Sequence, residues 1–422
     1  MPAKPPQAYR ARYIFPGLRP PIEGGVLHTR NDLIVAVKSS PESTASDLGE
    51  VAILPGLVNA HTHLEFSDLH CPLGNRGMQF PNWLRCVITE RRNRSISSPT
   101  RSVQQGLWEC LASGVTTVGE IATSDWTDPV FPNTPQRCVL FREQIALSVN
   151  RFDEQRNTAE QWLEQVHDLH LFRGLSPHAP YTVHPNLVSE ICRLSGQYQV
   201  PLTMHLAESM DELELLTSGS GPMMEFLSEL GAWDPAAIPR GIRIMDYLHL
   251  LAKADHGLVI HGNFLSNEEI RYLADSRDRL SVVYCPRTHD FFEHGPYPLR
   301  SMLEAGVRIA LGTDSRASNP DLDLMEEFRF LCGKETGLSP SDLLALITVN
   351  PAEALGLQQR IGNLEPGKAA DFIVVDLPQR SAVDPHDLLA DPNAKVRQVY
   401  IAGQLVYDAN PPHPDTGFPD DD

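Results

Sequence analysis

Short runs of apolar residues recur along the central part of the chain, and longer stretches of helical character separate them. From Gly56 onward the runs are rich in β-branched residues, and strands that alternate with helices are typical of a parallel α/β fold. Eight runs can be counted, beginning at Ile53, Gly114, Cys138, Phe172, Val200, Gly257, Leu280 and Gly306. Eight such units in roughly 250 residues predict a (β/α)8 TIM-like barrel.

The two ends of the chain have a different pattern, in which short apolar runs are separated by Gly and Pro turns. Examples are GGVLHT and DLIVAVK near the start and GKAADFIVVDL and VRQVYIAGQLVYD near the end. Neither end can bury a sheet face alone, so we expect both to pair in one small β-sandwich. The predicted domains are 1–55 with 362–422 for the sandwich and 56–361 for the barrel, with helices near LSPSDLLALIT and NPAEALGL leading out of it.

Polar residues that follow directly on the apolar runs are the candidates for chemistry, because a barrel of this type carries its active site at the C-terminal ends of the strands. These residues are His61, His63, His178, His205, His261 and Asp314. A catalytic divalent metal needs three or four N/O ligands and an open position for water. The pair His61 and His63 shares one strand face and would supply two of them.

Two further ligands would come from His205 and Asp314, which belong to other strand ends. Taken singly, His205 is also compatible with a hydrogen-bonded core histidine, and Asp314 with a helix N-cap. An H-x-H pair alone is likewise a weak signal. The coincidence of all four at one end of the barrel favours a metal site.

Composition narrows the function classes. The formal net charge of −19 is spread along the sequence, and no Lys/Arg-rich block stands out beyond Glu90 to Arg94, so a nucleic-acid partner is not expected. There is no run of 18 apolar residues and no apolar h-region at the start, and we expect no membrane contact and a cytoplasmic location. Seven cysteines without a C-x-x-C pair indicate reduced thiols rather than a cysteine-based zinc site.

Six motifs occur together in the chain: PGLVNAHTH, SPHAPYTVHP, MHLAES, VIHGN, LGTDS and LEPGKAADFIVVD. As a set they resemble the amidohydrolase superfamily, in its cytosine-deaminase-like branch of adenosylhomocysteine and methylthioadenosine deaminases. The resemblance extends from about Ile53 to about Asp376. It implies one divalent metal ion, Zn²⁺ or alternatively Fe²⁺, held by His61, His63, His205 and Asp314. Binuclear relatives take a lysine from strand four, where FRGLSPHAPYT offers none.

The resemblance also implies the residues that move protons. In similar deaminases a glutamate at the position of Glu208 takes the proton of the attacking water and delivers it to the ring nitrogen. The histidine matching His261 orients that water, and Asp314 helps to transfer the second proton until ammonia leaves. The alternatives are stabilisation of a helix start for Glu208 and a structural strand-end histidine for His261.

A different class of zinc deaminase uses H-x-E followed by P-C-x-x-C. His63-Leu64-Glu65 matches the first half, but the chain has no P-C-x-x-C, and this interpretation is rejected. Glu65 is then expected to support a metal ligand or the loop after the first barrel strand.

Three residues are candidates for contact with substrate. FPNWLRCVITERR resembles the segment of nucleoside deaminases in which a glutamate, here Glu90, accepts hydrogen bonds from two ribose hydroxyls; the alternative is a solvated helix face beside Arg91. His178 matches a family position that contacts the nucleoside. Arg142 is a candidate for contact with the base or the 5′ substituent, with a salt bridge to Glu143 as the alternative.

One loop departs from the family pattern. After strand seven the usual C-P-x-S-N is replaced by CPRTHDFFEHGPYPL, Cys285 to Leu299. This loop, with HLEF after His63, also resembles the aminodeoxyfutalosine deaminases, so the 5′ group stays open. Phe291 and Phe292 would stack on an aromatic 5′ substituent or pack the loop.

Three functions therefore remain. The first is a metal-dependent aminohydrolase that acts on an adenosine-like nucleoside of the methylthioadenosine, adenosylhomocysteine or aminodeoxyfutalosine type. The second is hydrolysis of another amino-heterocycle, such as guanine, cytosine or a triazine, or of a cyclic amide. The third is an inactive relative used for binding or assembly. In the first two the partner is a small-molecule substrate, and a homodimer is one alternative for the assembly.

Overall fold

The computed structural model describes residues 6–40, 42–94, 98–123, 131–165, 170–334 and 336–410. The ends of the predicted sandwich domain, 1–5 and 411–422, lie outside these ranges. Within them, no helix is both long and apolar enough to cross a membrane. All seven cysteines carry free thiols, in agreement with the expectation from the sequence.

Eight parallel strands form the central sheet, in the order β15-β14-β13-β12-β11-β10-β9-β8. They are β8 (Leu57–Thr62), β9 (Val115–Ala122), β10 (Arg137–Gln144), β11 (Leu171–Pro177), β12 (Pro201–Leu206), β13 (His256–His261), β14 (Leu280–Tyr284) and β15 (Ile309–Leu311). Each predicted run overlaps one of them, which confirms the (β/α)8 barrel. The first run is longer than its strand, because its start belongs to β7 (Val51–Pro55) of a different sheet.

The barrel closes where β15 meets β8. A parallel bridge joins Thr62 to Asp314, and the N–H of Asp314 donates to the carbonyl of His61 at 3.1 Å. The buried Asn59 side chain spans the same seam: its Nδ2 donates to Thr313 Oγ1 at 2.8 Å, and its Oδ1 accepts from Thr313 N at 3.2 Å. This closure brings Asp314 beside the two histidines that end strand β8.

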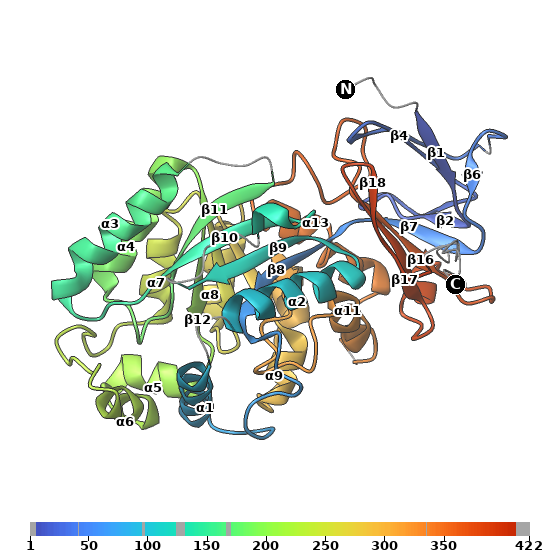
Figure 1. Ribbon diagram of the computed structural model, residues 1–422. Helices are drawn as coiled ribbons and strands as arrows, with labels where there is room; N and C mark the ends of the chain where they lie inside the picture. The colour runs from blue at the N-terminus through green and yellow to red at the C-terminus, as the bar shows by residue number, and fades with distance from the viewer. Residues whose placement is uncertain are drawn as a thin grey trace, which may run out of the picture.

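Helices surround the strands (Figure 1), and apolar residues of helices and strands share one large buried core. The helices of the barrel are α1 (Phe80–Asn93), α2 (Ser98–Ala112), α3 (Phe152–Glu164), α4 (Pro185–Tyr198), α5 (Met210–Ser218), α6 (Pro222–Glu229), α7 (Ile244–Leu251), α8 (Asn267–Asp275), α9 (Pro286–Phe291), α10 (Leu299–Ala305) and α11 (Leu324–Cys332). The predicted helices that lead out of the barrel are α12 (Pro340–Ala345) and α13 (Val349–Ala354); α14 (His386–Leu389) follows them.

Strands from both ends of the chain form two further sheets, which appear side by side in blue and red in Figure 1. One has the order β5-β4-β1-β6 and the other β18-β17-β16-β7-β2-β3. Their bounds are β1 (Gln7–Arg10), β2 (Tyr13–Ile14), β3 (Ile22–Glu23), β4 (Val26–Arg30), β5 (Leu33–Lys38), β6 (Ser46–Asp47), β16 (Phe372–Asp376), β17 (Lys395–Ile401) and β18 (Gln404–Asp408).

The two terminal sheets share one apolar core. Leu27 and Ile34 of one sheet pack in the same buried cluster as Ile53, Phe372 and Tyr400 of the other. In the second sheet β7 pairs antiparallel with β16, with Phe372 opposite Pro55, so the two ends of the chain depend on each other. The predicted sandwich from both termini is confirmed, whereas the exact domain limits at 55/56 and 361/362 stay a prediction.

Candidate metal centre and active site

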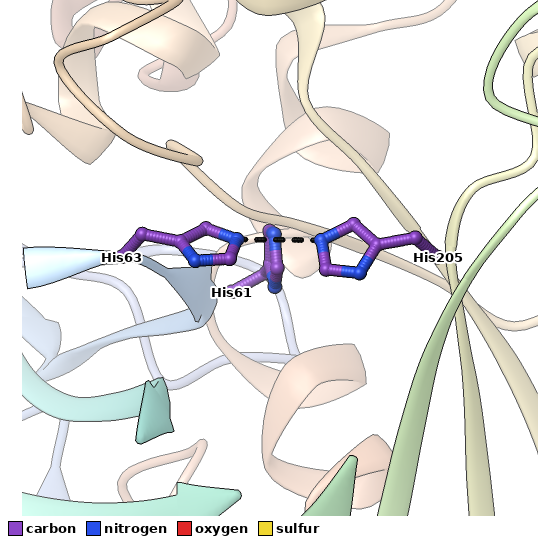
Figure 2. Close-up of side chains that lie close together, drawn as sticks. All are labelled: His61, His63 and His205. Carbon is purple, nitrogen blue, oxygen red and sulfur yellow. Dashed lines mark hydrogen bonds between the residues drawn. The ribbon is translucent and has the colours of Figure 1, made fainter. Parts of the chain in front are cut away.

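Three histidines converge at one end of the barrel (Figure 2). His61 is the next-to-last residue of strand β8, His63 follows that strand, and His205 comes from β12. One ring nitrogen of each lies within 4.8 Å of the other two, and the Nε2 atoms of His63 and His205 are 3.3 Å apart. Residues 142 positions apart in the sequence thus form one buried histidine triad, which has the geometry of a metal site.

The protonation of the triad suits a metal ligand. Burial, together with the neighbouring His63 and His205, holds the pKa of His61 well below its usual value, and burial does the same for His63. Both ring nitrogens of His61 are buried and have no hydrogen-bond partner among the described residues. A buried polar atom without a partner is costly, whereas a neutral imidazole presents a lone pair that a metal ion satisfies. The residues present therefore fit a bound metal.

Hydrogen bonding orients the third ring. Nδ1 of His205 lies 3.1 Å from the carbonyl oxygen of His178, so Nδ1–H donates to that carbonyl and Nε2 faces the other two rings. Burial lowers the pKa of His205 to about 3. A fixed tautomer of this kind is a common support for metal-ligating histidines.

Asp314 lies beside the triad. Its Oδ1 is 3.8 Å from Nε2 of both His61 and His63, and its backbone adopts a left-handed φ of 57°. Ser318 Oγ donates to the Oδ2 atom at 3.0 Å. Burial raises the pKa of this carboxyl to about 7. Three imidazoles and one carboxylate are a donor set that zinc accepts.

Glu208 and His261 form a pair next to these residues. Glu208 Oε1 lies 3.3 Å from Nε2 of His261, and both side chains are buried. Burial, followed by the charges of Asp314 and Glu212, raises the pKa of Glu208 well above its usual value. A carboxyl group with a raised pKa holds a proton more firmly than usual and can act as a general acid.

Two of the predicted substrate residues, His178 and Arg142, lie near the C-terminal ends of barrel strands and are partly buried. His178 follows β11, and its Nδ1 is 2.7 Å from Thr182 Oγ1 while its Nε2 is 4.0 Å from Glu143 Oε1. Arg142 lies in β10, two residues before its end, and Glu143 follows it. Burial raises the pKa of Glu143, and the charges of Arg91 and Arg142 act in the opposite direction.

The side chain of Glu90 is 31% exposed on α1 and accepts a hydrogen bond from Nε of Arg94 at 3.2 Å. This ion pair is the kind of contact that the helix-face alternative describes. The proposed contact of Glu90 with a ribose stays a prediction.

Glu65 supports the loop after β8 rather than contacting the triad. Its carboxylate forms an ion pair with Arg91, and its carbonyl accepts from Arg94. Arg91 is a residue that the sequence analysis missed, since it was considered only as a neighbour of Glu90. Arg91 follows Glu90 in α1, and successive helix residues are rotated by about 100°. The sequence therefore indicated that Arg91 and Glu90 lie on different faces of the helix.

The unusual strand-seven loop is packed by its phenylalanines. Phe292 lies 5.7 Å from the ring of Phe80 and 5.3 Å from that of Trp83, both on α1. Phe291 lies 5.2 Å from Phe292, and both are buried. Of the two alternatives, packing of the loop is the one that these contacts describe.

Comparison with known proteins agrees with this arrangement. A model of the amidohydrolase family matches residues 52–406. The chain belongs to the amidohydrolase family. A 5-methylthioadenosine/S-adenosylhomocysteine deaminase of Moorella thermoacetica is 30% identical over 363 residues, which are 82% of this chain and 78% of that protein.

Two solved structures of other organisms resemble the amidohydrolase described here. The Helicobacter pylori aminofutalosine deaminase in complex with methylthio-coformycin has a TM-score of 0.84 at 23% identity, over 95% of this chain and 100% of that one, and supports the fold. A Xanthomonas campestris adenosine deaminase with bound zinc has a TM-score of 0.72 at 25% identity, over 95% and 93% of the two chains. This amidohydrolase is therefore an enzyme, a hydrolase of carbon–nitrogen bonds other than peptide bonds, and the alternative of an inactive relative is set aside.

Proposed function

We propose that this amidohydrolase deaminates an adenosine-like nucleoside of the methylthioadenosine, adenosylhomocysteine or aminodeoxyfutalosine type and releases ammonia. The observation that carries the proposal is the Glu208–His261 pair, 3.3 Å apart, beside the buried triad. The amino-acid identity with methylthioadenosine/adenosylhomocysteine deaminases over most of the chain supports the substrate class.

The proposed cofactor is one Zn²⁺ ion, with Fe²⁺ as the alternative, because a His₃Asp donor set accepts several first-row ions. His61, His63, His205 and Asp314 would hold it. When bound, such an ion lowers the pKa of a coordinated water toward neutrality and so supplies a nucleophile. The other roles belong to the side chains around it.

Glu208 is the proposed proton carrier. Its carboxylate takes the proton of the attacking water and passes it to the ring nitrogen next to the carbon that is attacked. His261, which contacts Oε1 of Glu208, orients the water. Asp314 assists the second proton transfer, which makes ammonia the leaving group.

Substrate is proposed to contact Glu90, His178 and Arg142. A carboxylate at position 90 suits the two vicinal hydroxyls of a ribose. The Nε2 atom of His178 and the guanidinium of Arg142 both lie beside Glu143, so they flank one part of the mouth. A bare base such as guanine or cytosine would use fewer of these groups.

The test is ammonia release by the zinc-loaded protein with a panel of substrates. The panel contains adenosine, methylthioadenosine, adenosylhomocysteine, 6-amino-6-deoxyfutalosine, adenine, guanine and cytosine. Selective turnover of a nucleoside is expected. Turnover of a free base alone would contradict the ribose contact, and silence across the panel with metal bound would overturn the proposed reaction in favour of other amide hydrolysis.

A further inference from the structure

Strand β12 leaves the barrel through an unusual turn that ends at Glu208. Ala207 adopts a left-handed φ of 53°, a conformation that costs energy for a residue other than glycine and persists only when its surroundings hold it. The N–H groups of Ala207 and Glu208 point the same way, toward α5. They donate to the two carboxylate oxygens of Glu212, at 3.0 Å and 2.9 Å respectively.

Glu212 is fully buried, and its own N–H donates to Ser209 Oγ at 3.2 Å. Two consecutive backbone N–H groups that face one carboxylate form a concave anion site. Because hydrogen bonds to a charged acceptor are strong, this contact stabilises the left-handed turn. It also determines the direction in which the Glu208 side chain leaves the backbone.

The carbonyl group of Glu208 is held from the opposite side. Nδ2 of Asn263, two residues after His261, donates to Glu208 O at 2.9 Å. Asn263 Oδ1 lies 3.1 Å from Nδ1 of His289, whose Nε2 lies 2.8 Å from the carbonyl of Gly295. His289 and Gly295 belong to the strand-seven loop that departs from the family pattern.

We propose that Glu212 and Asn263 are positioning residues that hold the N–H and the C=O of Glu208 between them, with His289 supporting Asn263 from the strand-seven loop. This inference rests on the proposed role of Glu208. The clamp keeps Glu208 Oε1 within reach of His261. It also gives the unusual loop a task in the reaction that is independent of the 5′ group.

The alternative for Glu212 is a purely structural role as part of a capping box. In that motif a Ser at the N-cap and a Glu three residues later accept hydrogen bonds from each other's backbone N–H groups. Ser209 and Glu212 have this spacing, and Ser209 Oγ accepts from Glu212 N. The chain contains a matched case without the extra contacts. Ser266 and Glu269 form a capping box at the start of α8, and the buried Glu269 carboxylate accepts from Ser266 N.

The matched pair E212Q and E269Q tests the inference. In E212Q one acceptor oxygen becomes an NH₂ group that faces a backbone N–H, so two donors oppose each other. We expect kcat to fall by about 10- to 100-fold, with KM within about twofold and zinc content at the wild-type level. E269Q makes the same chemical change at the capping box of α8 and is expected to keep the wild-type kcat.

A double-mutant cycle with E208Q identifies the route of the effect. If Glu212 acts through Glu208, E212Q lowers the residual rate of E208Q by less than about twofold, since interacting residues are not additive. Full additivity, or a wild-type kcat for E212Q, would overturn the inference. Wild-type protein that deaminates no member of the panel would instead refute the proposed function, so the two failures are distinct.

Asn263→Leu provides a second variant on the carbonyl side if E212Q does not fold. It removes the donor to Glu208 O at similar side-chain size and leaves Glu212 intact. A 10- to 100-fold loss of kcat, again absent in the E208Q background, supports the clamp. An unchanged kcat in folded, zinc-loaded N263L would overturn it.

Discussion

The two sides of the barrel mouth are built differently. On the metal side His61, His205 and Asp314 lie at or directly after strand ends, are buried, and are held by backbone hydrogen bonds across the barrel. On the substrate side the candidates Glu90 and Arg142 are half-buried, and one of them lies on a helix rather than a strand. The metal side holds buried imidazoles whose pKa values are lowered, whereas the substrate side carries half-buried charged groups.

The difference shows which kind of site tolerates change. Strand ends are fixed by the register of the sheet, so a ligand there cannot move without opening the barrel. A side chain on α1 depends only on the rotation of one helix and on local ion pairs such as Glu90–Arg94. A single ion pair within one helix contributes only a few tenths of a kcal/mol. Substitutions should therefore have larger effects on the metal side.

The largest effect is expected from removing a metal ligand. His61→Ala and Asp314→Ala should each lose bound zinc and turnover together, because the ion contributes several kcal/mol to the transition state, equivalent to about a thousandfold in rate. Metal content by atomic emission and ammonia release check this prediction.

Glu208→Gln is the matched control for those two variants. It should retain zinc and lose about 10²- to 10⁴-fold in kcat, the usual contribution of a general acid–base group. Wild-type turnover by Glu208→Gln would contradict the proton carrier, and full zinc retention by Asp314→Ala would contradict the fourth ligand.

A smaller effect is expected from Glu90→Gln on the substrate side. Loss of a charged hydrogen bond to the ribose costs about 1.5 kcal/mol, so KM for the preferred nucleoside should rise about tenfold, with kcat nearly unchanged. The corresponding 2′,3′-dideoxynucleoside should show no difference between the variant and the wild type. An equal change with both substrates would favour the helix-face alternative, in which Glu90 only pairs with Arg94.

The smallest effect is expected on the free energy of unfolding at low pH. Burial lowers the pKa of His294, in the strand-seven loop, to about 4. Below its usual pKa near 6.5 the unfolded chain therefore binds a proton that the folded chain does not, and the free energy of unfolding falls as pH falls toward about 4.

His294→Gln removes that proton uptake. Between about pH 7 and about pH 5 the zinc-loaded wild type should lose about 1 kcal/mol more stability than the variant, a value reduced for the partial exposure of the ring. Urea unfolding at both pH values measures it. Parallel losses in the two proteins would show that His294 titrates normally.

Much of the fold was predictable because each strand is a local apolar run. The run from Val200 begins one residue before β12 and ends two residues after it, and the position of His205 within the run placed the ring at the barrel mouth. The run from Ile53 was less informative, since it contains both β7 of the terminal sheet and β8 of the barrel. A continuous buried run does not show where one strand ends and the next begins.

The metal site was predictable for the same reason, whereas its supporting residues were not. Glu212 has the spacing of a capping box, which hides its contacts with Ala207 and Glu208. Asn263 ends the motif VIHGN, but the motif does not show which groups its side chain contacts. Both roles depend on side chains that meet only after β12 and β13 are paired.

The sequence by itself determined the barrel, the terminal sandwich and the residue types at the strand ends. Each strand is visible as a local hydrophobic pattern, and in a parallel barrel the residues that follow the strands all lie at the same end. Only the tertiary structure decided the closure of β15 on β8, which brings Asp314 to 3.8 Å from His61 and His63, and the hydrogen bonds that hold Glu208. Those contacts join residues distant in the chain, and their geometry depends on how the strands pack and on a left-handed backbone turn that no local pattern specifies.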